Sequence, residues 1–223
     1  MDVYKKSKIK SIVCWTIAFI LAIFYLIVSF LPFIFMVLNS FKEKFEMLTK
    51  GVFELPASLD LSNYKEVLSG GFGRYFMNSV IVLVISLILL LFIASCASYP
   101  LARFKFKLAN PIYGLIVACM SIPVHITLIP VFKMSQATGL YDSIWALIGP
   151  YVAFAVPISV FILTSFMKEI PREIEESAEI DGCGKIKMFF SMILPLSKPG
   201  LATLAIYNGV NMWNEFSFAY TLT

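Results

Sequence analysis

Residues 75–102 read YFMNSVIVLVISLILLLFIASCASYPLA, a run that contains no charged residue. A helix needs about 20 mostly apolar residues to cross a bilayer, so this run is long enough to span one. The other charge-free runs are Ser11–Phe41, Leu108–Phe132, Ser143–Met167 and Pro199–Asn214. The last of them suffices if Glu215 lies near a membrane interface. The sequence therefore predicts an all-α polytopic membrane protein.

The composition favours the same class. Of 223 residues, 59% are hydrophobic and 14% are charged, whereas soluble domains carry about 25% charged residues. We expect one transmembrane domain over residues 1–223, with a cytoplasmic loop at 168–198. Its spans are expected at about 12–38, 76–100, 110–132, 144–166 and 200–222. The first run is far longer than the about 7–15 apolar residues of a signal-peptide core, so we expect an uncleaved first span.

The distribution of positive charge predicts the topology. All 18 Lys and Arg residues lie outside the five runs. The short segment 103–107 carries only basic charges, whereas the longer segment 42–74 balances five basic with five acidic residues. The positive-inside rule then places the N-terminus and the loops at 103–107 and 168–198 in the cytoplasm. The net charge of +4 thus reflects orientation, and we expect no nucleic-acid partner.

Motifs for catalysis or metal binding are not found in the sequence. Residues 182–185, Gly-Cys-Gly-Lys, resemble part of a phosphate-binding loop, but Glu179 and Ile186 occupy positions that need glycine and Ser or Thr. We therefore expect no catalytic residue, no ATP hydrolysis and no cofactor in this chain. His125 is the only histidine, and the cysteines lack metal-ligand spacing, so no metal site is expected. The cysteines are Cys14, Cys96, Cys119 and Cys183.

The third and fourth predicted spans contain several prolines. They are Pro123, Pro130, Pro150 and Pro157. Proline inside a membrane helix marks a kink or a broken helix, which is tolerated where neighbours satisfy the freed carbonyl groups. This number of prolines favours a bundle that moves over a simple membrane anchor.

The loop between the fourth and fifth spans carries more information than a connection requires. Residues 169–181 include six acidic side chains, Pro171 suits a first helical turn, and Gly182 suits a C-terminal cap. On such a helix Ile170, Ile174 and Ala178 form a narrow apolar stripe. A second short helix, about 185–193, should stop before Pro195. Membrane-surface helices are normally rich in Lys and Arg, so the acidic first helix favours a basic protein groove as its partner.

The spacing within this loop resembles a known family. Glu176-Ser177-Ala178 is followed after three residues by Gly182, and after nine more by Met192-Ile193-Leu194-Pro195. This order resembles the Glu-Ala-Ala loop of binding-protein-dependent ABC importer permeases, Glu-Ala-Ala-x3-Gly-x9-Ile-x-Leu-Pro. Ser177 replaces the first alanine and Met192 replaces the isoleucine, while the spacing is intact.

Other stretches resemble the carbohydrate, or maltose-type, subfamily of these permeases, and within it the smaller maltose-G-like subunit. They are Leu61-Ser62-Asn63-Tyr64, Asn78-Ser79, Ala97–Arg103, Glu179–Gly182 and Trp213-Asn214-Glu215-Phe216. The resemblance implies the type I ABC importer transmembrane fold. That fold has six core helices and the sequence shows five, so the domain is expected to be incomplete at its C-terminal end.

The resemblance also implies partners. They are a homologous second permease, a cytoplasmic ABC ATPase dimer that binds ATP and magnesium, and an extracellular solute-binding protein, assembled in the lipid bilayer of a bacterial inner or plasma membrane. In the family, the Glu-Ala-Ala loop is the coupling helix that docks in a groove of the ATPase. The matching positions, which we expect to dock, are Glu175, Glu176, Ser177, Ala178, Asp181 and Gly182.

The fifth span carries a one-sided polar stripe. At 100° per residue, its members fall within an arc of about 120°. They are Asn208, Asn211, Asn214 and Glu215. Such a stripe faces a partner helix or a water-filled cavity. Contact with sugar hydroxyls, with Tyr207 and Trp213 stacking on sugar faces, is one interpretation, and interhelical hydrogen bonding is the other.

The sequence therefore predicts a sugar or oligosaccharide permease that couples to a separate ATPase. Import of another solute, such as glycerol phosphate or a polyamine, is an alternative, because the docking loop is common to these importers. A non-transporting membrane scaffold is a second alternative. The prolines and the polar stripe favour transport, and the particular solute does not follow from this chain.

Overall fold

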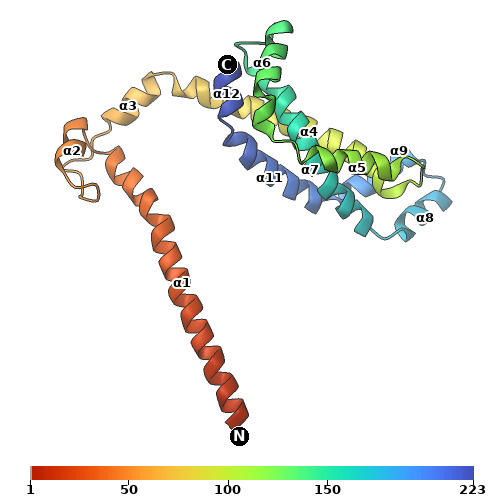
Figure 1. Cartoon of the computed structure of the whole chain (residues 1–223), viewed down its shortest axis with the longest axis horizontal. Coiled ribbons are helices and arrows are strands. Elements are labelled where there is room, and N and C mark those ends of the chain that lie inside the picture. The colour runs from red at the N-terminus through yellow and green to blue at the C-terminus, as the bar shows by residue number, and fades with distance from the viewer. Residues whose placement is uncertain (1) are drawn as a thin grey trace. The chain divides into compact units, whose positions relative to one another are not determined.

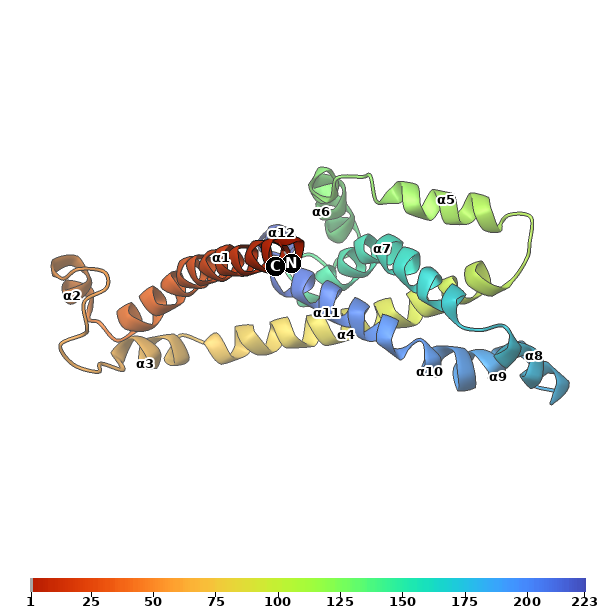
Figure 2. The same ribbon diagram turned by 90° about the horizontal axis from the view of Figure 1, so that it is seen from below.

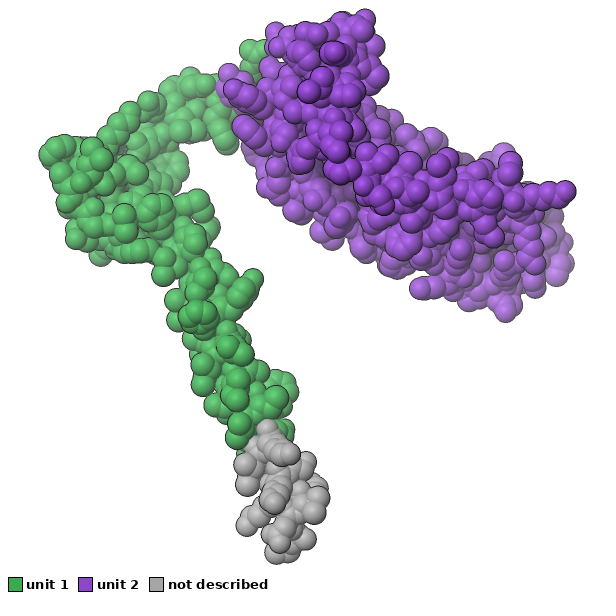
Figure 3. Space-filling view, in the orientation of Figure 1, with its two compact units in different colours: residues 1–74 green, residues 75–223 purple. Residues whose placement is uncertain are grey.

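The computed structural model describes residues 2–223, with side chains from residue 11 onward, and every element in this range is a helix. In chain order the elements are α1 (Asp2–Ser40), α2 (Lys44–Thr49), α3 (Ser62–Ser69), α4 (Phe72–Arg103), α5 (Ala109–Cys119), the 3-10 helix η1 (Val124–Thr127), α6 (Leu128–Ala137), the 3-10 helix η2 (Ile144–Leu147), α7 (Ile148–Glu169), α8 (Glu173–Ile180), α9 (Lys185–Met188), the π-helix η3 (Phe189–Ile193), α10 (Leu194–Leu196), α11 (Lys198–Trp213) and α12 (Ser217–Leu222) (Figure 1). The chain divides into two compact units, residues 1–74 and 75–223 (Figure 3).

Three helical segments are long and apolar enough to cross a membrane. They are Ser11–Ser40, Phe72–Arg103 and Ile144–Glu169. Two further pairs of helices qualify if each bent pair is one span: α5 with η1 and α6, bent by 86°, and the α9–α10 segment with α11, bent by 68°. The structure thus confirms the all-α membrane-spanning class, with three to five candidate spans among the described residues.

The predicted third and fifth spans are interrupted. Residues 110–132 fall on the bent pair, which breaks before η1, where Pro123 caps the 3-10 helix in an extended conformation. Proline has no backbone N–H and disfavours the helical conformation of the residue before it, which explains the break. Residues 200–222 fall on two helices, because α11 ends at Trp213 and α12 begins at Ser217.

The second helix of the predicted coupling loop does not stop before Pro195. It continues through η3 and α10 to Leu196. In an α-helix the proline ring would clash with the carbonyl of Ser191, four residues earlier. The wider π turn at Phe189–Ile193 lies immediately before the proline and accommodates it. The predicted stop is therefore wrong, and the helix ends at Ser197.

The first unit includes an ordered segment between α1 and α3. Lys42 is fully buried there, and its Nζ donates a hydrogen bond of 3.0 Å to the carbonyl of Gly51. The carboxylate of Glu46 pairs with Lys50 and accepts a hydrogen bond from the backbone N–H of Ala57. Internal hydrogen bonds and one buried ammonium thus contribute to the order of this segment.

The second unit has two apolar clusters, at its opposite ends. One contains Leu163, Met167, Met188 and Ile193 and lies beside α8; the other contains Leu90, Tyr151, Met212 and Phe218 and lies beside α12. Figures 1 and 2 show α8 and α12 at opposite ends of this unit, with α4, α7 and α11 running between them. Two candidate sites, one at each end, are thereby held by the same three helices.

Candidate functional site

The helix predicted between Pro171 and Gly182 is present as α8. Its first turn contains Glu173, Glu175 and Glu176, near the positive end of the helix dipole. Gly182 follows it with a φ of 74°, a left-handed conformation that glycine adopts without steric cost. The glycine signal is therefore confirmed at the C-terminal end, whereas α8 begins at Glu173, two residues after the Pro171 predicted in its first turn.

The inner face of α8 packs on its own chain. Ala178 is 2% exposed and belongs to the apolar cluster that Ile170 also contacts. Glu175 is buried as well, with its Oε1 2.7 Å from Nε of Arg103, the last residue of α4. The apolar stripe predicted on this helix thus faces the chain's own core, and Glu175 and Ala178 do not lie on the surface open to a partner.

The outer face of α8 carries the remaining predicted docking positions. Glu176, Ser177, Asp181 and Gly182 are exposed. Beside them, Ile180 is 87% exposed and Ile186 of α9 is 77% exposed. We call these six residues the docking face. It combines acidic and hydroxyl groups with two exposed apolar side chains, a composition suited to a protein groove.

Sequence reasoning missed the two isoleucines. The available signal was angular: Ile180 lies about 120° around the helix from Ile174, off the apolar stripe. An apolar residue outside the stripe has no place in the chain's own core, so it projects outward. For Ile186 the sequence holds no comparable signal, because α9 is too short to define a face.

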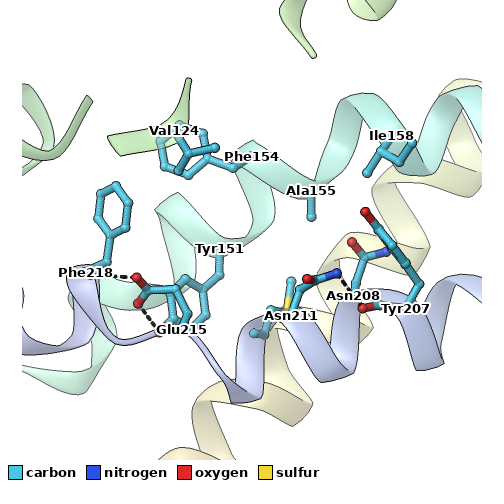
Figure 4. A pocket seen from close by; sticks show the side chains of 11 residues that line it. Val124, Tyr151, Phe154, Ala155, Ile158, Tyr207, Asn208, Asn211, Glu215 and Phe218 are labelled. Carbon is cyan, nitrogen blue, oxygen red and sulfur yellow. Dashed lines mark hydrogen bonds between the residues drawn. The ribbon is translucent and has the colours of Figure 1, made fainter. Parts of the chain in front are cut away.

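A cavity of about 280 Å³ lies at the other end of the second unit, between α7 and α11 (Figure 4). Aromatic and aliphatic side chains form most of its wall, with a few amide, hydroxyl and carboxylate groups. Its lining residues are Val124, Tyr151, Phe154, Ala155, Ile158, Tyr207, Asn208, Asn211, Met212, Glu215 and Phe218.

The structure brings three of the four predicted stripe residues to this cavity. Asn208, Asn211 and Glu215 line it, whereas Asn214 does not. Asn208 is buried and donates hydrogen bonds to Oγ of Ser159 and to the carbonyl of Leu204. Asn208 makes the interhelical hydrogen bond of one interpretation. It also borders a cavity, as the other interpretation needs, while contact with sugar stays a prediction.

Asn211 and Asn214 have similar local geometry and different surroundings. Each is exposed and donates a 2.8 Å hydrogen bond to the carbonyl four residues earlier, Tyr207 for Asn211 and Val210 for Asn214. Only Asn211 borders the cavity. The two residues thus form a matched pair for mutagenesis. Of the two aromatics proposed to stack on sugar, Tyr207 lines the cavity, whereas Trp213 packs edge-on against Phe76.

Glu215 has a structural contact set as well as a place in the cavity wall. Its Oε1 accepts a hydrogen bond from the backbone N–H of Phe218, and its Oε2 accepts from Ala219 and from the hydroxyl of Tyr151. Figure 4 shows the carboxylate between Tyr151 and Phe218. Glu215 therefore supplies the first turn of α12 with hydrogen-bond acceptors and ties that helix to α7.

Comparison with known proteins identifies the family to which the chain belongs. Residues 92–223 match the family model described as the binding-protein-dependent transport system inner membrane component. The chain belongs to this family. The matched region contains both the docking face and the cavity, and the assignment confirms the resemblance drawn from the Glu-Ala-Ala spacing. The chain is a transport permease of the ABC importer class.

Curated relatives share most of the permease. An ABC transporter permease protein, ORF2, of Caldicellulosiruptor sp. (strain Rt8B.4) is 48% identical over 97% of this chain and 78% of its own length. The diacetylchitobiose uptake system permease protein NgcG of Streptomyces coelicolor is 37% identical over 88% of this chain and 65% of its own length. The melibiose/raffinose/stachyose import permease protein MelC of Bacillus subtilis is 34% identical over 85% and 69%, respectively.

Proposed function

We propose that the chain is the permease subunit of a sugar or oligosaccharide importer, and that it docks a separate ATPase through the docking face. Relatives whose names state a substrate support the substrate class: NgcG with diacetylchitobiose, MelC with melibiose, raffinose and stachyose, and MsmG of Streptococcus mutans, a multiple sugar-binding transport system permease protein. The proposal includes a homologous second permease, an extracellular binding protein, and an ATPase dimer that binds ATP and magnesium.

The cavity chemistry supports a neutral, hydroxylated solute. Its lining includes no Lys or Arg among the described residues, which a glycerol phosphate site would use to pair the phosphate. Glu215 is the one carboxylate in the lining, and both its oxygens already accept hydrogen bonds from Tyr151 and α12, so the cavity offers a single, structurally engaged acid to a polyamine that carries several cations. Amide groups and aromatic rings remain, which suit sugar hydroxyls and sugar faces.

The observation that carries the docking proposal is the division of α8 into two faces. The inner face is fixed to the chain's own core, and the outer face presents Glu176 and Ile180 at the end of the unit opposite the cavity. The positive-inside pattern puts this end, and the N-terminus, in the cytoplasm. Closure of the ATPase dimer on ATP would then move α8, and the helices that run from α8 to the cavity would switch the access of the solute.

The docking step is tested by reversing charge on the docking face. Glu176→Lys should remove co-purification of the ATPase with the permease and abolish uptake, because it places a cation against a basic groove. Glu54→Lys changes the net charge equally at an exposed residue of the 42–74 segment, so it controls for charge alone. Retention of the ATPase by Glu176→Lys at the wild-type ratio would contradict the proposed docking.

The solute step is tested with the matched asparagines. Asn211→Ala should raise the sugar concentration for half-maximal uptake about 10-fold, equivalent to one hydrogen bond in a partly dehydrated site. Asn214→Ala removes the same amide on the same helix, outside the cavity, and should leave uptake unchanged. Uptake of labelled sugars by the reconstituted complex measures both. Equal effects of the two variants would argue against the cavity as the sugar path.

A further inference from the structure

Arg103 is placed differently from the other basic residues near it. The segment 103–107 contains Arg103, Lys105 and Lys107. Both lysines are exposed, as expected for charges that only orient the chain, whereas the Arg103 side chain is 2% exposed. Burial of a guanidinium is unfavourable unless it is paired, so this residue requires an explanation beyond topology.

The guanidinium of Arg103 contacts both ends of residues 170–175, the segment that connects α7 to the docking face. Its Nη2 donates a 2.7 Å hydrogen bond to the carbonyl of Ile170, at the C-terminal end of α7. Its Nε lies 2.7 Å from Oε1 of Glu175, whose side chain is 11% exposed. Arg103, at the end of α4, thus makes a hydrogen bond to the end of α7 and a close ion pair with the first turn of α8.

Aromatic packing extends this attachment to the other side of the docking face. Tyr99, one turn before Arg103 on α4, stacks on Phe189 of η3 with the ring centroids 4.9 Å apart. Its hydroxyl lies 3.4 Å from the carbonyl of Lys185, at the start of α9. The last turn of α4 thus contacts α8 through Arg103 and the α9–η3 segment through Tyr99.

We propose that Arg103 and Glu175 form a positioning pair that transmits movement of the docking face to α4. The chain connects α8 covalently only to α7 and, through the 181–184 turn, to α9. Tyr99 links α4 to α9 and η3, whereas the Arg103–Glu175 pair links α4 directly to α8. A buried ion pair, with Arg103 also hydrogen-bonded to the carbonyl of Ile170, makes α8 and the end of α4 move as one body. It is a contiguous physical connection of the kind that can carry coupling between distant sites.

This inference rests on the proposed docking of an ATPase, and it assigns Glu175 to an internal link in place of the partner contact predicted from the sequence. It also separates the roles of two adjacent acids: Glu176 contacts the partner, and Glu175 passes the movement on. Variants of the two residues should therefore differ in phenotype. Loss at Glu176 is loss of assembly, and loss at Glu175 is loss of coupling within an assembled complex.

The test uses the full complex of both permeases, ATPase and binding protein in proteoliposomes. Arg103→Met and Glu175→Gln should retain the ATPase at the wild-type ratio, while sugar transported per ATP hydrolysed falls about 10-fold, within the usual range of coupling between sites. Lys105→Met and Glu169→Gln make the same changes at exposed neighbours and should transport normally. Normal transport per ATP by Arg103→Met and Glu175→Gln would overturn the proposal.

A single variant leaves one buried charge unpaired and can fail to fold. The double variant Arg103→Met/Glu175→Met removes both charges and fills the space with apolar groups, so it keeps the proposal testable. It should assemble, and it should remain uncoupled. Wild-type transport per ATP in this double variant would show that the pair serves folding alone and would refute the transmission role.

A direct measure of joint movement completes the experiment. Spin labels on Cys96 of α4 and on Glu173→Cys of α8, with the other cysteines replaced by serine, report the distance between the two helices. In the wild-type complex this distance should be the same without nucleotide and with bound ATP, whereas in the double variant it should change. A distance that changes in the wild type would contradict the single-body movement. Loss of ATPase binding by Glu176→Lys tests the docking separately, so failure of either proposal can be recognised.

Discussion

Glu215→Ala should loosen the C-terminal helix α12 selectively. The carboxylate of Glu215 accepts hydrogen bonds from the backbone N–H groups of Phe218 and Ala219, at 2.8 and 3.1 Å. A helix-capping side chain contributes about 1 kcal/mol, with a range of about 0.5–2, and bonds to an ionised acceptor are about twice as strong as neutral ones. We therefore expect a loss of about 2 kcal/mol, which corresponds to about 30-fold more frequent opening of α12.

Hydrogen exchange of residues 217–222 in the assembled complex measures this opening. Glu215→Ala should raise the exchange rate there about 30-fold. Tyr151→Phe deletes the third contact but leaves both backbone acceptors in place, so its effect on α12 should be about 5-fold or less. Asn214 is adjacent in sequence, and its side-chain amide donates to the carbonyl of Val210. Asn214→Ala should therefore leave the exchange rate of residues 217–222 unchanged. Unchanged exchange in Glu215→Ala would refute the capping role, as would a larger effect of Tyr151→Phe.

Two further predictions concern packing and pH. A Cβ at Gly200 would lie 2.8 Å from the Phe166 ring, so Gly200→Ala should lower stability by about 1–3 kcal/mol, measured by thermal denaturation in detergent, while Gly149→Ala, which meets no atom within 4 Å, should be tolerated. The pKa of Glu46 lies below its ordinary 4.5, because Lys50 and the N–H of Ala57 bind the carboxylate. Its stabilisation of the 42–60 segment is thus complete above pH 4.5 and is lost as the pH falls through the lowered pKa. Proteolysis of this segment should accelerate as the pH falls below 4.5, and Glu46→Gln should be insensitive to that change.

Local signals predicted that α8 is a helix, and they did not predict which of its sides faces the chain's own core. Gly182 marked the end of α8 because glycine acts through its own backbone geometry, whereas α8 begins at Glu173, two residues after Pro171. The side of α8 that faces inward depends instead on Arg103, which is distant in sequence from its partner Glu175. No pattern within the loop contains that contact, so the sequence could not separate Glu175 from Glu176.

The polar stripe shows a similar limit. Helical periodicity placed Asn208, Asn211 and Glu215 on one side of a span, and the structure brings these three to one cavity. Periodicity alone did not exclude Asn214 from the predicted cavity residues, because the edge of the cavity is set by α7 on the opposite side. The break after Trp213 was also not predicted, because Asn214 and Glu215 were assigned to the polar stripe of one continuous span, whereas α11 ends at Trp213 and α12 begins at Ser217.

The two faces of α8 have a consequence for suppressor genetics. A defect at Glu176 or Ile180 lies on the outer face, so compensating changes should be found in the gene of the ATPase. A defect at Glu175 or Ala178 lies on the inner face, so its compensating changes should be found within this chain, on α4 or α9. A selection for restored growth on the transported sugar would thus sort the residues of a single two-turn helix by the gene in which their suppressors arise.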